Sequence, residues 1–100
     1  MNFINLTPHA IVLNDGRTFK SSEKNARVST QLVEIKEGFY SQTFGEITDL
    51  PKPINDTLFI VSGMVKSATT RTDVIAPATS HKDTKRNDKG HIISVPGFIL

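Results

Sequence analysis

The sequence predicts a single α+β domain, mainly β, in which one short helix covers a small, curved, antiparallel or mixed sheet. Three observations support this prediction. The length of 100 residues is enough for one domain, residues 1–100, with a modest core. Short runs of branched and aromatic residues alternate with turn signals, as in β-rich proteins. Only residues 63–70 place their apolar side chains at helical spacing.

The first half of the chain is expected to begin with a β-hairpin. Phe3–Leu13 has strand composition and is followed by Asn14-Asp15-Gly16. Asp-Gly between two apolar stretches predicts a type I′ turn, and Arg17–Lys20 is then the partner strand. The other expected strands of this half are Leu32–Ile35 and Tyr40–Leu50, with a turn at Gly38 and a break at Pro51–Pro53.

The second half contains the most apolar run, Thr57–Ser62, which predicts a central strand buried on both faces. Ser62 is placed to cap the short helix that follows. Strand character returns at Thr72–Pro77. The polar stretch Ala78–His91 predicts a long loop or hairpin tip, and His91–Leu100 predicts a closing strand that is bent near its end.

Composition excludes several classes of function. A net charge of +2 without a strong basic cluster argues against binding to duplex DNA. The chain has no cysteine, which excludes disulfides and a thiol nucleophile. No apolar stretch is long enough to span a bilayer, and the first ten residues lack the pattern of a signal peptide. We therefore expect a cytoplasmic protein without membrane contact.

The sequence contains no recognisable metal or catalytic motif. The histidines, His9, His81 and His91, form no metal-binding spacing, so we expect neither a metal nor a cofactor. No serine or cysteine nucleophile stands in a catalytic context. Catalysis is therefore disfavoured, although it stays open.

Four polar groups are candidates for binding, and each also has a structural interpretation. Asn5, Thr7 and His9 form either a binding loop or an extended entry into the first strand. Ser62 and Gly63 make either an anion site or a simple strand-to-helix turn. Arg71 and Asp73 point to one side of an extended chain, so they form either an ion pair or an oriented phosphate ligand. The basic residues Lys82, Lys85, Arg86 and Lys89 belong either to a solvated loop or to a lid over an anion.

The order of several motifs resembles a set of small proteins encoded by phages and prophages. The motifs are "NLTPHAIVL", "FGEITDLP", "LFIVSGMV" and "RTDVIAP", and the resemblance covers nearly the whole chain. It carries over onto Asn5, Thr7, Pro8, His9, Ser62, Arg71, Asp73 and Pro77.

This resemblance implies a protein of the host cytoplasm that works by binding. We expect it to bind a small anionic, nucleotide-like ligand without turnover and so to sequester a host immune signal. The alternatives are an inhibitor or accessory factor that binds a host protein, and a hydrolase of the same ligand. The expected ligand-binding residues are Asn5, Thr7, His9, Ser62, Arg71, Asp73 and Arg86.

Two expectations concern the arrangement of this site. We expect Thr7 and His9 to lie near Arg71 in space and to form part of a pocket wall. The exposed strand edges of a small β-rich protein also favour a homo-oligomer, and a pocket between subunits is one arrangement of the site.

Overall fold

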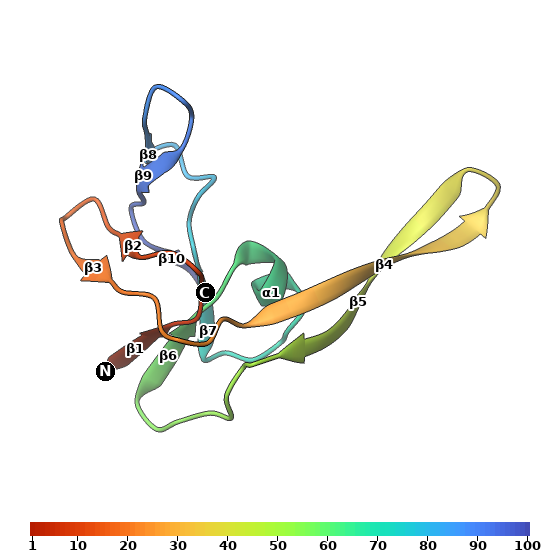
Figure 1. Cartoon of the computed structure of the whole chain (residues 1–100), viewed down its shortest axis with the longest axis horizontal. Helices are drawn as coiled ribbons and strands as arrows, with labels where there is room; N and C mark the ends of the chain where they lie inside the picture. Colours follow the sequence, from red (N-terminus) through yellow and green to blue (C-terminus); the bar gives the residue numbers. More distant parts are fainter.

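A four-stranded mixed sheet forms the centre of the computed structural model, which describes residues 1–100 (Figure 1). The strand order is β1-β6-β7-β10. β1 (Asn2–Asn5), β6 (Thr57–Ile60) and β7 (Val74–Pro77) run parallel, whereas β10 (Phe98–Ile99) is antiparallel to β7. This arrangement confirms the predicted α+β fold, mainly β, with a mixed sheet.

The one helix, α1 (Gly63–Ser67), lies in the connection between β6 and β7. Ser62 caps it as predicted, because the Ser62 hydroxyl accepts a hydrogen bond from the backbone N–H of Val65 at 3.3 Å. The helix ends three residues earlier than expected. The hydroxyl of Thr69 accepts the N–H of Arg71, which gives the backbone a local alternative to another helical turn.

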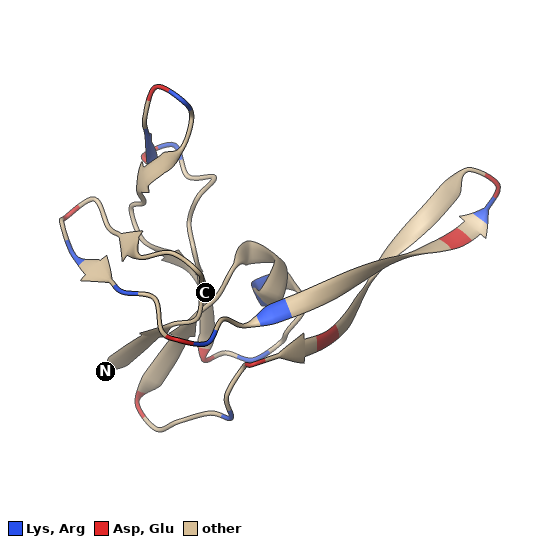
Figure 2. Cartoon of the chain, in the orientation of Figure 1, with Lys and Arg blue, Asp and Glu red and all other residues tan.

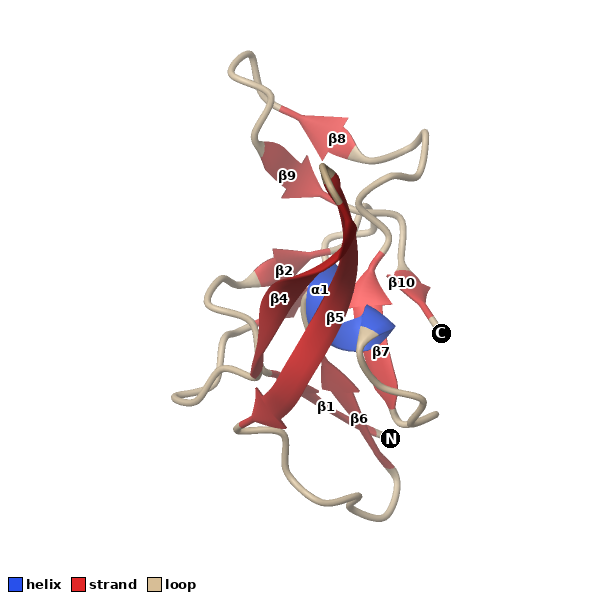
Figure 3. Ribbon diagram, turned by 90° about the vertical axis from the view of Figure 1, so that its right-hand side faces the viewer, coloured by secondary structure: helices blue, strands red, loops and turns tan.

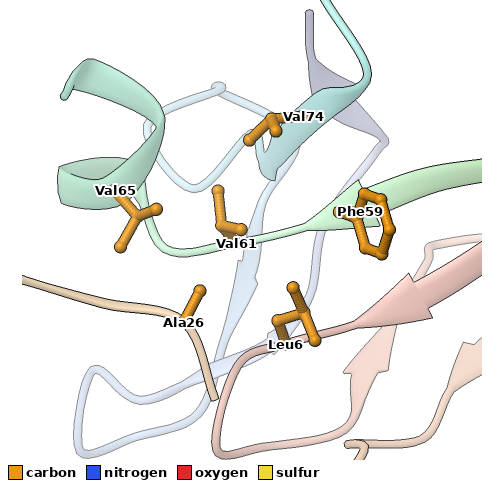
Figure 4. Packing of buried hydrophobic residues seen from close by; sticks show 6 residues of the cluster. All are labelled: Leu6, Ala26, Phe59, Val61, Val65 and Val74. Carbon is orange, nitrogen blue, oxygen red and sulfur yellow. The ribbon is translucent and has the colours of Figure 1, made fainter. Parts of the chain in front are cut away.

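One face of the sheet packs against α1 and the root of the hairpin formed by β4 (Arg27–Lys36) and β5 (Phe39–Thr48) (Figure 3). Phe59 and Val74 are paired across β6 and β7, so their side chains share this face. Figure 4 shows that these two side chains gather in one cluster with apolar side chains from the helix and the neighbouring loops. The cluster consists of Leu6, Ala26, Phe59, Val61, Val65 and Val74.

The other face of the sheet is covered by the small hairpin of β2 (Ile11–Val12) and β3 (Thr18–Phe19). Phe3, Phe19 and Phe98 form an aromatic cluster there, with ring centroids 5.1 to 6.3 Å apart. Phe59 on one face and Ile60 on the other are both fully buried. The prediction of a central strand buried on both faces is therefore confirmed.

The β2–β3 turn differs from the predicted type I′ turn. Gly16 has a φ of +97°, but Asn14 and Asp15 do not have positive φ values. The N–H of Gly16 donates to the carbonyl of Leu13, and the loop contains three residues rather than two. Asn14 is held elsewhere, since its amide donates to the Asp83 carbonyl and its oxygen accepts from the Ser94 hydroxyl.

The β4–β5 hairpin projects from the rest of the molecule as a long arm (Figure 1). Each strand has ten residues. The turn lies at Gly38, as predicted, and Gly38 has a φ of +80°, a value that glycine adopts without strain. The arm gives the chain a radius of gyration of 15.3 Å. A compact chain of 100 residues has about 13 Å, so the chain is less compact than its length predicts.

A third hairpin follows β7, within and after the polar stretch Ala78–His91. β8 (Lys85–Arg86) pairs antiparallel with β9 (Ile92–Ser94), so the predicted hairpin tip is confirmed. The expected closing strand is divided into β9 and β10, with the bend at Pro96 and Gly97 between them. No helix of the structure is long and apolar enough to cross a membrane.

Phe59→Ala is expected to lower the free energy of unfolding by about 3–5 kcal/mol, because deleting a fully buried ring leaves a cavity. Met64→Ala removes a half-exposed side chain from the adjacent helix and is expected to cost less than about 1 kcal/mol. Urea denaturation followed by circular dichroism measures both losses. Equal losses would contradict the packing described.

Candidate functional site

The carboxamide of Asn5 joins three backbone segments at the end of β1. Its nitrogen donates to the carbonyl of His9 and to the carbonyl of Phe19, each at 2.9 Å. Its oxygen accepts the N–H of Thr7 at 2.9 Å and lies 2.6 Å from the Thr7 hydroxyl. Both amide hydrogens and the amide oxygen are therefore used, in a side chain that is almost fully buried.

Thr7 extends this network to the next loop. Its hydroxyl also lies 2.9 Å from the His9 carbonyl, so it donates either to that carbonyl or to Asn5. The backbone carbonyl of Thr7 accepts a hydrogen bond from the Ser21 hydroxyl. The loop after β3 is thereby tied to the end of β1.

These contacts correct two expectations about the N-terminal motif. Phe3–Leu13 is not one strand, because β1 ends at Asn5 and β2 begins at Ile11. The motif is not an extended entry into the first strand either, because the strand precedes it and Thr7 to His9 form a bend. The Asn5 side chain binds the backbone of Thr7 and His9 and so folds the chain back on itself.

The His9 side chain, unlike its backbone, is exposed and lines a cavity of about 310 Å³. The cavity lies beyond the carboxyl ends of β1 and β7, an edge where open α/β sheets commonly bind ligands. Most of its wall is apolar. The lining residues are His9, Ala10, Ile11, Val12, Pro77, Thr79 and the four residues Ile92 to Val95.

The basic β8–β9 hairpin stands beside this cavity. Lys85 pairs with Ser94 and Arg86 pairs with Ile92, and both partners line the cavity. The Arg86 guanidinium donates to the carbonyls of Gly90 and Thr79. Figure 2 shows that positive and negative charges alternate around the tip of this hairpin. Of the predicted ligand-binding residues, His9 thus lines the cavity, and Arg86 contacts the cavity residue Thr79.

Arg71 and Asp73 form the ion pair that their spacing predicts. Arg71 donates through Nε to Asp73 Oδ1 at 2.9 Å and through Nη2 to Oδ2 at 2.7 Å. Its Nη1 donates to the carbonyl of Pro51 at 2.8 Å. All three guanidinium nitrogens are engaged within the chain, so Arg71 anchors the loop at Pro51 to the start of β7.

The expectation that Thr7 and His9 lie near Arg71 is wrong. Asn5 pairs with Ile60, and Ile60 pairs with Ile75, so these three residues form one row across the sheet. Thr7 and His9 follow this row at the carboxyl ends of the parallel strands. Arg71 precedes Ile75 by four residues and lies before the turn at Thr72 and Asp73, ahead of the amino end of β7. The two motifs therefore stand at opposite edges of the sheet.

Ser62 lies neither at the first cavity nor beside the ion pair of Arg71 and Asp73. It borders a second, shallower cavity of about 340 Å³ between α1 and the root of the arm. Pro8, Arg27 and Met64 are among its other lining residues. The seven predicted residues are therefore divided. His9 lines the first cavity, Arg86 contacts its lining residue Thr79, and Asn5 and Thr7 bind the backbone carbonyl of His9. Ser62, Arg71 and Asp73 lie elsewhere.

Sequence reasoning missed most of the residues that line the first cavity. Thr79 stands two residues after β7, and Ile92 to Val95 belong to a strand that was expected only to close the sheet. A signal was present, because the polar stretch before His91 is followed directly by the apolar pair Ile92-Ile93. No group of three or more histidine, aspartate or glutamate residues is arranged to hold a metal ion.

No protein-family model matches the chain, and neither a curated protein nor a solved structure has significant similarity to it.

Asn5→Asp is expected to lower the free energy of unfolding by about 3 kcal/mol or more. The substitution removes two buried donors and places a carboxylate against two carbonyl oxygens. Asn55→Asp, at an exposed position, is the matched control and is expected to change stability little. Chemical denaturation of both variants tests this, and a stable Asn5→Asp variant would contradict the network.

Asp73→Asn is expected to cost about 1–2 kcal/mol at neutral pH by weakening a partly buried, bidentate ion pair. The hydrogen bonds from Arg71 hold the pKa of Asp73 below its ordinary value of 3.8. The ionised carboxylate therefore stabilises the fold above about pH 4, and this contribution is lost as the pH falls through the lowered pKa. Unfolding curves of parent and variant are expected to differ at pH 6 and to converge in strong acid. A constant difference between them would contradict this.

Proposed function

We propose that the protein binds a small nucleotide-like ligand in the cavity beside His9 and does not turn it over. The observation that carries this proposal is the apolar cavity opening next to a basic hairpin. A nucleotide combines a flat, weakly polar base with an anionic phosphate, and these two surfaces match its two parts.

The apolar part of the cavity fits a single aromatic ring system. Its volume of about 310 Å³ is at the lower end of the range for small-molecule sites. Ala10, Pro77 and Ile93 are among the side chains that face it. Thr79 and the His9 imidazole provide the few polar groups that such a site needs for orientation.

The phosphate is assigned to the β8–β9 hairpin. Between Ala78 and His91 the chain carries four lysine and arginine side chains and two aspartates, which leaves two net positive charges. Arg86 is the most suitable ligand among them, because its guanidinium lies at the carbonyl of the cavity residue Thr79. A planar guanidinium binds phosphate through two parallel hydrogen bonds.

Binding without turnover is favoured by the polar groups around the cavity. A nucleophile needs a base within hydrogen-bond reach and a third group that orients the base. The Ser94 hydroxyl is turned away to donate to Asn14, and no aspartate or glutamate lines the cavity. The resemblance to phage proteins supplies the biological role of the proposal, which is sequestration of a host nucleotide signal.

The test is titration calorimetry with AMP, a cyclic dinucleotide and ADP-ribose. Arg86→Ala is expected to weaken binding of the recognised nucleotide about 10- to 100-fold, the loss typical of a hydrogen bond to a charged group. Ala10→Phe fills the cavity from its rim without changing the charge and is expected to abolish binding. Lys52→Ala removes an exposed charge beside Pro51, at the opposite edge of the sheet, and is expected to have no effect.

The fate of the ligand separates the alternatives. Intact nucleotide recovered after denaturing the complex supports sequestration, whereas a cleaved product would identify a hydrolase. Binding that is unaffected by both Arg86→Ala and Ala10→Phe would refute the site. No binding to any of the three nucleotides, together with tight binding to a host protein, would favour the inhibitor.

A further inference from the structure

We infer that the β4–β5 arm is an assembly surface, which packs against a second copy of this chain through the face that carries Leu32, Tyr40 and Phe44. This inference is independent of the ligand cavity, because none of these residues lines it. Its basis is the strand register, the accessible area and the charge distribution of the arm.

The register divides the arm into two faces, and one of them continues the core. Val28 and Ile47 are paired, and both pack against the core cluster. Because paired residues share a face and alternate residues of β4 return to it, this face continues outward along β4, past a register shift between Val28 and Thr30. Its next pairs are Thr30 with Phe44, Leu32 with Gln42 and Glu34 with Tyr40.

The apolar side chains of this face continue the core outward without cover. Leu32, Tyr40 and Phe44 have exposed fractions of 69, 56 and 42 %. The opposite face carries the polar Ser29, Gln31 and Ser41 together with two exposed apolar side chains, Val33 and Ile35. A two-stranded sheet that continues the core and is covered only at its root resembles one layer of an incomplete core.

The accessible area supports a permanent interface. The chain exposes 7104 Å². A folded monomer of this mass is expected to expose about 5,600 Å². The excess of about 1,500 Å², taken over the whole chain, is larger than the ~800 Å² per partner that ordinary complexes bury.

The hairpin itself also requires support along its length. A two-stranded hairpin is marginally stable in water unless a third strand or another layer packs on it. β4 and β5 pair only with each other, so each leaves one edge of backbone groups unpaired. A partner that covers the apolar face would supply the support that the outer part of the arm lacks within one chain.

A second copy meets this condition, because it is made together with the first. The arm does not oppose self-association, since Arg27 and Lys36 nearly balance Glu34, Glu37 and Glu46. The middle of the arm, Val28–Val33 and Tyr40–Gly45, carries no charge at all, and Figure 2 shows this uncharged length. Two identical apolar faces can meet about a two-fold axis, which is the commonest symmetry of homo-oligomers.

Light scattering coupled to size-exclusion chromatography tests the inference with a matched pair of variants. The parent chain is expected to have at least twice its monomer mass of 11.0 kDa. Leu32→Lys is expected to raise the dissociation constant for self-association at least tenfold and so to favour the monomer. Val33→Lys adds the same charge one residue away, on the opposite face, and is expected to leave the assembly intact.

A cysteine variant keeps the test decisive if Leu32→Lys does not fold. Because the chain has no cysteine, Leu32→Cys gives a single thiol that is expected to form an intermolecular disulfide rapidly, whereas Val33→Cys is expected to stay reduced. A folded parent that remains monomeric at all concentrations would overturn the inference, as would equal cross-linking of both variants. Protection of the arm only by a different protein would also overturn it.

Discussion

The carboxamide of Asn5 is the contact on which the arrangement of the site depends. It is almost fully buried, and a buried amide without partners is strongly destabilising, so its hydrogen bonds determine the local backbone path. Through them β1 ends, the chain turns at Thr7 to His9, and β3 is held beside the turn. The Asn5 amide binds the backbone carbonyl of His9 and so positions the His9 side chain at the cavity wall.

The elements that the sequence predicts well are those determined by neighbouring residues. Thr57–Ser62 is apolar without interruption, Ser62 caps the next turn, and Arg71 lies two residues from Asp73. Each of these patterns requires only local geometry, and the structure confirms each one. The end of β1 was not predictable in this way. One partner of Asn5 is the carbonyl of Phe19, fourteen residues away, and no short pattern encodes that contact.

The position of the candidate site depends on topology for the same reason. His9 and Arg71 belong to motifs that look alike in the sequence, since both combine polar residues with a nearby strand. The register of β1, β6 and β7 separates them, because one motif follows its strand and the other precedes it. The cavity proposed for the ligand and the face proposed for self-association likewise use different parts of the chain. The cavity is built on the sheet edge, whereas the arm extends a core that one chain leaves uncovered.

Hydrogen exchange of side-chain amides, followed by NMR, tests the central role of Asn5 most directly. If its carboxamide is bound as described, its two protons exchange about 100-fold more slowly than those of the exposed Asn55 side chain, because exchange requires local opening. Equal exchange rates for Asn5 and Asn55 would contradict the account, because the end of β1 would then lack the contact that positions His9.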